Sequence, residues 1–519
     1  MKKLHKIITS FVLLALMVSC TKGILNKTPL DQLSPDTFYN NETEAKMGLM
    51  GLYASIIPVN FSLPWYQYEF MSDNSGSMDW TGSMAFSSWE QNSSTVTAIE
   101  KWKLAYQTIV RVNTFLANIE KATMDETIKT QMKAEAMFLR AYMYADLVHF
   151  YGDVPLILKV QTLEEAKVAR TPKSDVLNAV YTDLDYAAAN LPVSYESANI
   201  GQATKGAALA FKTRTLLYNE NWTEAAKAAK DVMDLGVYDL FPDYEGLFKE
   251  ENENNKEVIF DIQYIKDLQA QPWPTAPTVF DDWPCGNVNL SLVDAYYMTN
   301  GLAIDNPSSG YDEQNPYINR DPRMAASIVL PGSMRGSSIF IPATLSISQG
   351  MTGIKTRKYA DLNNPNKGNC GINTILMRYA DILLMRAEAL IASGVTTQEV
   401  YDLINQVRAR VNMPKIETVE GTGLNQEQLQ QILHHERRVE FFMEGTRYSD
   451  IRRWKEESAI HNTYGYVLSK LSDPLDKNKW IFERTKVDTR SFDPAKGWLW
   501  PIPQTELQNN EKLTQNPGY

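Results

Sequence analysis

Residues 203–236 restrict the fold more than any other part of the sequence. Residues 203–218 and 222–235 each place alanine and larger apolar side chains three to four positions apart, which is the period of an amphipathic helix. Residues 219–221 interrupt this pattern, and Gly236 ends it. Because small side chains let two helices approach closely, we expect a tightly packed antiparallel helix pair.

The same helical period recurs along most of the chain. Alanines at the contact positions and a bulky residue at the turn are typical of a tetratricopeptide repeat, and stacked helix pairs of this kind form a solenoid. The predicted fold class is therefore all-α, a superhelix of tetratricopeptide-like helix pairs. Further helices are predicted over residues 43–57, 102–119, 132–151, 375–392, 397–411 and 425–443.

Two long segments without helical period interrupt this body. Residues 58–98 and 250–370 are rich in Gly, Pro, Asn, Ser and Trp, a composition that predicts surface loops with short strands. Long loops on a rigid body usually carry the function, so we expect the ligand site there.

The N-terminus has the features of an export signal. Three lysines precede the apolar stretch 7–18, which is too short to span a bilayer as a helix. The stretch ends in Leu-Met-Val-Ser-Cys, which resembles a bacterial lipobox, so residues 1–19 are predicted to be removed and Cys20 to be lipidated. An ordinary signal cleaved after another small residue is the alternative. A lipid on Cys20 would be the only membrane attachment, since no other apolar run reaches spanning length.

Charge and motif content narrow the possible activities. The chain has 51 basic and 62 acidic residues, a net charge of −11, which argues against nucleic acid as a partner. The five histidines form no metal or nucleophile motif, and no phosphate-binding loop occurs. We expect a protein that is not an enzyme and has no cofactor. A glycoside hydrolase with two distant carboxylates remains an alternative, because sequence spacing does not exclude it.

The most charged stretch is interpreted as structural. Interleaved acids and bases along a helix usually form ion pairs with neighbouring elements. The residues concerned are Glu436, Arg437, Arg438, Glu440, Glu444, Arg447, Asp450, Arg452 and Arg453.

Amphipathic aromatic residues are abundant, with 26 Tyr and 11 Trp against 18 Phe. Two clusters of them, within residues 58–98 and 264–297, lie beside Asp and Asn. A sugar ring stacks its C–H face on an aromatic plane, while carboxylates and amides bind its hydroxyls. The clusters therefore favour a carbohydrate site, although packing of the long loops would explain many of these rings equally well.

Six segments spread over the chain resemble the successive motifs of the SusD/RagB family, which are lipidated surface glycan-binding proteins of Bacteroidota. They are AEAMFLRAYMYADLVHFYGDVPL (134–156), NRDPRM (319–324), MRYADILLMRAEAL (377–390), INQVRARVNMP (404–414), HERRVEFFMEGTRYSDIRRW (435–454) and WLWPIPQTELQNNEKLTQNPGY (498–519).

The resemblance implies a helical body of four tetratricopeptide-like pairs, a lipid anchor in the outer membrane facing outward, and a role as lid of a SusC-like TonB-dependent transporter. It implies glycan capture without catalysis, and the RagB branch makes peptide or another nutrient the alternative. One departure is that residues 21–24 (Thr-Lys-Gly-Ile) lack the acids that often follow the lipidated cysteine of surface-exported lipoproteins. We expect one composite domain over 20–519, with a helical body at 40–57, 100–250 and 371–455, inserts at 58–98 and 250–370, and a C-terminal segment at 456–519.

The ligand residues of this family do not transfer by motif, so they are predicted from the aromatic clusters. Stacking platforms are expected at Trp80, Trp89, Trp273, Trp283 and Tyr296, and hydroxyl partners at Asp73, Asn74 and Asn92. Two questions stay open. Asp281 and Asp282 would suit Ca²⁺, but no EF-hand spacing is present. Cys285 and Cys370 either pair in an oxidising envelope or remain free thiols, and we expect free thiols.

Overall fold

The computed structural model describes residues 38–58, 65–76, 83–271, 287–340, 352–362, 364, 366, 368–469 and 481–519. Its helices are α2 (Glu42–Ser55), α3 (Ser83–Ser87), α4 (Val96–Asn118), α5 (Glu126–Tyr151), α6 (Lys173–Asn190), α7 (Lys205–Tyr218), α8 (Trp222–Met233), α9 (Leu290–Ala295), α10 (Pro322–Ser327), α11 (Tyr379–Ala392), α12 (Gln398–Arg410), α13 (Ile416–Val419), α14 (Gln426–Glu440), α15 (Arg447–Trp454) and α16 (Gln504–Asn509). Its strands are β1 (Ser75–Gly76), β2 (Val258–Ile262), β3 (Asn287–Val288), β4 (Ile328–Val329), β5 (Met334–Arg335), β6 (Ser338–Ile339), β7 (Lys355–Thr356), β8 (Thr374–Arg378), β9 (Thr463–Ser469) and β10 (Ile481–Asp488).

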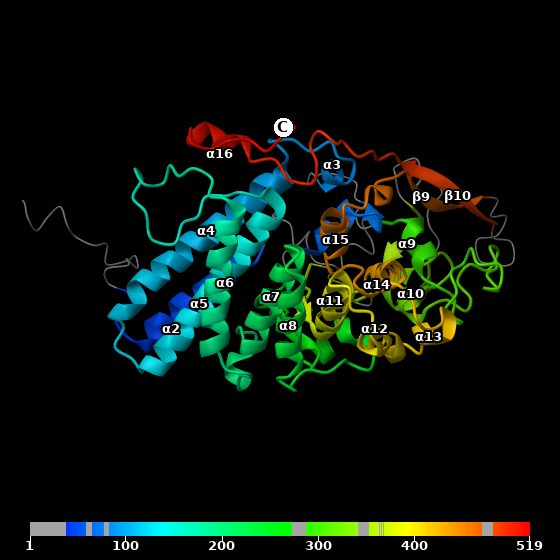
Figure 1. Cartoon of the computed structure of the whole chain (residues 1–519), viewed down its shortest axis with the longest axis horizontal. Helices are drawn as coiled ribbons and strands as arrows, with labels where there is room; N and C mark the ends of the chain where they lie inside the picture. Colours follow the sequence, from blue (N-terminus) through cyan, green and yellow to red (C-terminus); the bar gives the residue numbers. More distant parts are fainter. Residues whose placement is uncertain are drawn as a thin grey trace, which may run out of the picture.

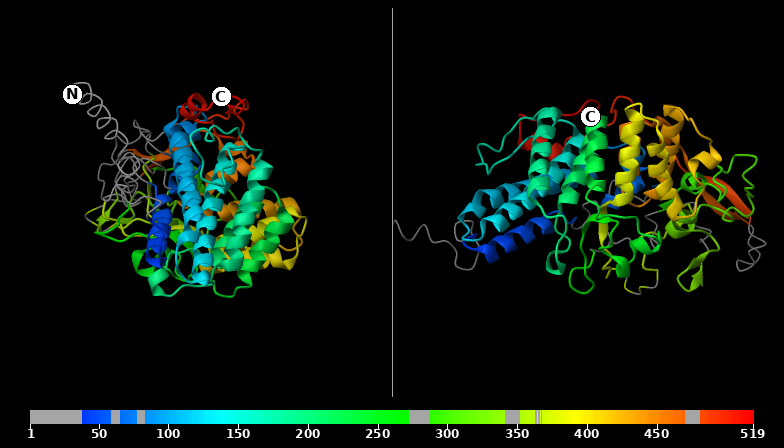
Figure 2. Two further views of the ribbon diagram at one scale, coloured as in Figure 1. Left: turned by 90° about the vertical axis from the view of Figure 1, so that its left-hand side faces the viewer. Right: turned by 60° about the horizontal axis from the view of Figure 1, so that its bottom comes forward.

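The long helices follow one another along the long axis of the molecule (Figure 1). Each of α4 to α7 packs on the helix that follows it, α8 packs on α11, and α11 packs on α12 and α14. Figure 2 (right), in which the bottom of the molecule is turned toward the viewer, shows the same succession of helices, coloured from cyan through green to yellow. The predicted all-α superhelix of helix pairs is confirmed, with α6 added to the predicted helices.

Local sequence signals explain where the main helices begin and end. Asp125 caps α5, because its carboxylate accepts hydrogen bonds from the backbone N–H groups of Thr127 and Ile128. The same helix ends at Gly152, whose φ of 74° suits glycine. Helix α14 begins with a reciprocal capping box between Asn425 and Gln428.

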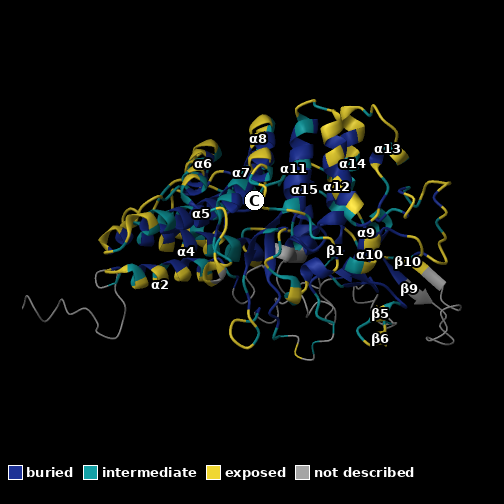
Figure 3. Cartoon of the chain, turned by 90° about the horizontal axis from the view of Figure 1, so that it is seen from below, coloured by how far each residue is buried: buried dark blue, intermediate teal, exposed yellow. Residues whose placement is uncertain are grey.

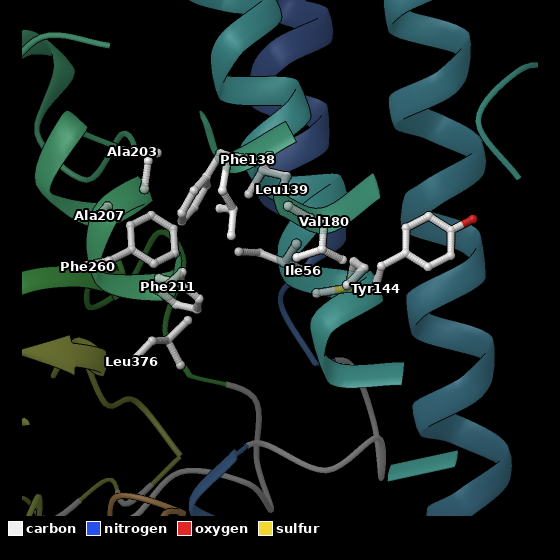
Figure 4. Packing of buried hydrophobic residues seen from close by; sticks show 14 of the residues in the cluster. Ile56, Phe138, Leu139, Tyr144, Val180, Ala203, Ala207, Phe211, Phe260 and Leu376 are labelled. Carbon is white, nitrogen blue, oxygen red and sulfur yellow. The ribbon is translucent and has the colours of Figure 1, made fainter. Parts of the chain in front are cut away.

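One large hydrophobic cluster joins the helices to the second insert. Phe138 of α5, Phe211 of α7 and Phe260 of β2 meet edge to face, with ring centroids 5.0 to 5.9 Å apart (Figure 4). Burying one such ring contributes roughly 1.5 to 3 kcal/mol. Strand β2 is therefore part of the core of the body as well as the start of the insert.

Strand β8 changes one predicted boundary. Residues 375–378 were expected at the start of a helix, but they form a strand that pairs antiparallel with β2, for example Ile262 with Thr374. Helix α11 begins only at Tyr379. Short apolar runs fit either helix or strand, and here pairing with a distant strand decides.

Ion pairs around α14 form a second, charged core. Arg378 contacts Glu257 and Glu440 at 2.7 Å and Glu444 at 2.6 Å, and Arg323 contacts Glu436 at 2.5 Å. Both arginines are fully buried. The structural role predicted for the charged stretch is confirmed, because its acids and bases join α14 and α15 to β8, α10 and α11.

The molecule has two unlike sides. Figure 3 shows helices α6, α8, α11, α12 and α14 on one side, and strands β5 and β6 with the long loops on the other. The predicted loop-and-strand character of residues 250–370 agrees with the described part of that segment. No helix in the described part of the chain combines the length and the low polarity needed to cross a bilayer.

Candidate functional site

The structure describes five of the eight predicted ligand residues, Asp73, Asn74, Trp89, Asn92 and Tyr296. The other predicted positions lie outside the described residues, and they are Cys20, Trp80, Trp273, Asp281, Asp282, Trp283 and Cys285. Cys370 is buried, but its pairing with Cys285 stays untested because only one of the two is described.

A small four-stranded sheet, in the order β1-β3-β7-β4, links the two aromatic clusters. Gly76 pairs directly with Asn287, and Ser75 pairs with Val288. The strands are antiparallel, so the end at which the chain leaves β1 lies beside the end at which it enters β3. The described roots of the segments that carry Trp80 and Trp283 are therefore neighbours, although they are far apart in the sequence.

Asp73 holds β1 in place through two arginines. Its carboxylate contacts Arg447 of α15 at 2.8 and 2.9 Å and Arg438 of α14 at 3.1 Å. Burial by itself would raise the pKa of Asp73, but the two guanidinium groups outweigh it and hold the pKa below its usual range. Asp73 is buried and already paired, so it positions the strand and offers no oxygen to a sugar in this structure.

The side chain of Asn74 is also engaged by hydrogen bonds within the protein. Its amide nitrogen donates to Glu69 Oε1 at 2.7 Å, and its amide oxygen accepts from Arg438 Nε at 2.7 Å. The other carboxylate oxygen of Glu69 is buried and has no hydrogen-bond partner among the described residues. Burial raises the pKa of Glu69 to about 8, so this carboxyl is protonated at neutral pH.

Further clamps on β1 come from an amide within the second aromatic cluster and from an arginine of the C-terminal segment. Asn289 donates to the backbone oxygens of Asp73 and Ser75, and Arg490 donates to those of Ser72 and Ser75. Arg490 lies in the C-terminal segment, far from β1 in sequence. The arginine-rich stretch was a signal for Arg438 and Arg447, and Asn289 lies in the second aromatic cluster, whereas nothing local pointed to Arg490.

Trp89 has a different role from the stacking platform predicted for it. Its side chain is only 4% exposed and packs edge to face against Phe492 and Trp498, with centroids at 5.0 and 5.2 Å. Its backbone oxygen accepts from Lys496. In this structure the C-terminal segment therefore covers the ring that a sugar would need, and Trp89 fastens that segment to the body.

Tyr296 and Asn92 also differ from the prediction in their surroundings. Tyr296 is 0% exposed and belongs to a hydrophobic cluster with Val293 and Met324, so its ring is not accessible here. Asn92 is exposed, and its side-chain oxygen accepts from the backbone of Ser94 in the turn before α4. Asn92 keeps free surface, but its polar group already supports a turn.

The histidines of the body are packing residues. His434 stacks on Trp454 and His435 on Tyr297, with ring centroids 3.3 and 3.7 Å apart, so these sequence neighbours point to different faces of α14. Burial lowers the pKa of both to about 4. Among the described residues, no group of three His, Cys, Asp or Glu side chains has the geometry of a metal site.

Comparison with known families matches two models to the chain. The model described as "SusD family" matches residues 245–519, more than half of the chain. The model described as "Starch-binding associating with outer membrane" matches residues 28–217.

Individual proteins agree with these matches over nearly the full length. SusD-like protein P25 of Formosa agariphila is 25% identical, and the alignment covers all of both chains. A SusD-like protein of Bacteroides fragilis has a similar structure, with a TM-score of 0.82 and 29% identity over 95% of this chain and 100% of that one. A SusD-like carbohydrate-binding protein of the same organism gives a TM-score of 0.80 and 29% identity over 92% of this chain and 100% of that one.

Proposed function

The chain belongs to the SusD family of non-catalytic binding proteins associated with the outer membrane, and from this we propose that it captures a glycan at the cell surface and delivers it to a SusC-like TonB-dependent transporter. It breaks no bond in this role. A lipid on Cys20 holds it to the outer membrane, facing outward, after residues 1–19 are removed. Residues 20–519 act as one composite domain.

One observation carries the position of the ligand site. Gly76 pairs with Asn287, so the described ends of the chain nearest Trp80 and Trp283 lie side by side. Two rings based on adjacent strand ends can serve one ligand, which supports a shared site on the loop side of the molecule. The similarity to a SusD-like carbohydrate-binding protein of Bacteroides fragilis supports a glycan as the ligand.

The clamps under this site support a passive, preformed platform. Arg438 and Arg447 bond the side chains of Asn74 and Asp73, and Arg490 donates to the backbone oxygen of Ser72, so residues 72–75 are already held in place before a ligand binds. Among the described residues of this region no pair of free carboxylates is available for acid–base chemistry, because Asp73 is paired and Glu69 is buried and protonated.

Affinity electrophoresis and calorimetry against a polysaccharide panel test the proposal. The wild-type protein should bind at least one glycan, and Trp80→Ala and Trp283→Ala should each weaken that binding about threefold to tenfold. Leu163→Ala, an exposed change on a distant loop, is the control and should leave binding unchanged. A wild-type protein that binds no glycan of the panel but co-purifies with a peptide would overturn glycan capture in favour of peptide uptake.

Partner and location need separate tests. A tagged chain should co-purify with a TonB-dependent transporter from outer membranes, and Cys20→Ala should release the chain from the membrane fraction. Protease added to intact cells should digest the wild-type protein. A chain that is cut only after the outer membrane is permeabilised would contradict the outward orientation.

A further inference from the structure

A second cleft lies on the helical body, apart from the site proposed above. Its volume is about 290 Å³, and its walls are the loop 191–204 between α6 and α7, the segment after α8, and residues 254–261, which include most of β2. None of its lining residues comes from the aromatic clusters in residues 58–98 and 264–297. It is therefore a different place on the molecule.

The walls of this cleft are fixed against each other. The backbone N–H of Lys205 donates to Pro192 at 2.8 Å and closes the loop at its base. Gly201 has a φ of 90°, and a Cβ atom there would lie 2.5 Å from the side chain of Gln263, so only glycine lets the two walls touch. Gln263 also donates to Asn254 at 3.0 Å. The cleft is thus preformed.

Two tyrosines, held by their hydroxyl groups, line the cleft. Tyr195 donates to Glu135 Oε1 at 3.1 Å, and the hydroxyl of Tyr238 lies 3.2 Å from Thr204 Oγ1. Both rings are only half-buried. Because the protein fixes their polar ends, the remaining ring surface is a rigid apolar platform of the kind on which a sugar ring stacks.

Polar groups beside the rings match hydroxyl groups. Gln202 is half-buried and Asn254 is exposed, and both amides line the cleft. Asp261 accepts from Gln263 at 2.6 Å and from Asn373 at 3.1 Å. Asp261 and Lys256 are the only charged residues among the lining residues, one of each sign, so the cleft suits an uncharged ligand.

Exposed apolar side chains complete the lining. Val193, Ile200 and Val237 are 37%, 47% and 38% exposed. Covering this surface would contribute roughly 25 cal/mol for each Å² removed from water. Apolar side chains, fixed aromatic rings and amides together make an environment with both the faces and the hydrogen bonds that a neutral sugar presents.

We propose that this cleft is a second glycan-binding site, which holds a neutral oligosaccharide away from the loop-side site. The inference rests on the proposed function, since it takes a glycan as the ligand of the protein. Two separate sites would let one long chain be held at two points, which raises its apparent affinity without new contacts at either site.

Hydrogen exchange of the full-length protein, with maltoheptaose and laminarihexaose as probes, tests this site directly. At least one probe should protect the backbone amides of residues 193–204 and 254–261. Val237→Arg, which fills the cleft with a charge, should abolish that protection, whereas Val110→Arg, a comparable exposed change on α4, should preserve it.

Tyr238→Ala should weaken binding at the cleft about threefold to tenfold, and Tyr238→Phe, which keeps the ring, should not. Thermal unfolding of each variant identifies loss of folding.

The outcomes separate this inference from the proposed function. Protection of the cleft that survives Trp80→Ala and Trp283→Ala but not Val237→Arg supports a second site. Binding that depends only on Trp80 and Trp283, with no protection of the cleft, overturns the second site and leaves the proposed function intact. No binding of the probes or of the polysaccharide panel at either place overturns both.

Discussion

Two regions of the molecule share one composition but use it differently. Residues 69–92 and the lining of the 191–261 cleft both combine aromatic rings with Asp, Asn or Gln. In the first region the described side chains are mostly buried and paired with arginines or aromatic neighbours, whereas in the second the tyrosines are half-buried and an amide is exposed. Composition therefore predicts the chemistry of a site but not whether the groups are available to a ligand.

The difference has a simple electrostatic origin. Asp73 and Asn74 face α14 and α15, and the arginines of these helices need polar partners. Arg447 binds the side chain of Asp73 and Arg438 binds that of Asn74, so neither side chain is available to a ligand. The cleft faces no such helix surface. The hydroxyl groups of its tyrosines are hydrogen-bonded and the ring of Tyr238 also stacks on Tyr379, but both tyrosines are only half-buried, so some ring surface remains accessible.

Removing Asp73 should have the largest effect. Asp73→Ala leaves the buried Arg447 and the half-buried Arg438 without their shared partner, and the free energy of unfolding should fall by about 3 to 5 kcal/mol. Urea denaturation measures this change, with Asn92→Ala as the exposed control at less than about 1 kcal/mol. Equal losses in the two variants would show that Asp73 is not the structural anchor described above.

Truncating Trp89 should lower the free energy of unfolding less than Asp73→Ala does, and its effect should be concentrated in the C-terminal segment. Trp89→Ala removes the ring between Phe492 and Trp498 and should lower the free energy of unfolding by about 3 kcal/mol. Limited proteolysis should then cut within residues 489–500 faster than in the wild type. Trp89→Phe, which keeps an apolar ring, should restore most of the resistance. Unchanged cleavage in Trp89→Ala would contradict the fastening role.

Glu69 should make stability depend on pH. Its pKa is about 8 in the folded protein against 4.5 ordinarily, so between these values the folded chain keeps a proton that the unfolded chain has released. The free energy of unfolding should therefore fall as pH rises from about 4.5 to about 8, where Glu69 becomes charged in both states. Glu69→Gln should remove this slope and, above pH 8, stabilise the protein by about 2 kcal/mol. Denaturation at a series of pH values measures both, and a parallel slope in the variant would refute the assignment.

Changes in the cleft should affect stability least. Ile200→Ser alters a side chain that is 47% exposed, so the free energy of unfolding should change by no more than about 0.5 kcal/mol. Comparing the change in the free energy of unfolding of this variant with that of Asp73→Ala measures how much more the residues around β1 contribute to stability than the lining of the cleft does. A loss of several kcal/mol in Ile200→Ser would mean that the cleft lining is part of the core.

The helical body was predictable because its signals are local. Residues 205–218 and 222–233 form the expected pair, and Asn425 caps α14 where the sequence placed its start. Residues 375–378 were predicted wrongly because their pairing partner, β2, lies more than a hundred positions earlier in the sequence. The site was predictable only as a composition, since the burial of Trp89 depends on Phe492 and Trp498 at the other end of the chain.

The sequence by itself determined the helix pairs, the role of the charged stretch and, through six dispersed motifs, the family. Only the tertiary structure decided which polar and aromatic residues are occupied and which are free. The physical reason is that periodicity and capping act over a few neighbouring residues. Burial and ion pairing join residues such as Asp73 and Arg447, which meet only after the whole chain has folded.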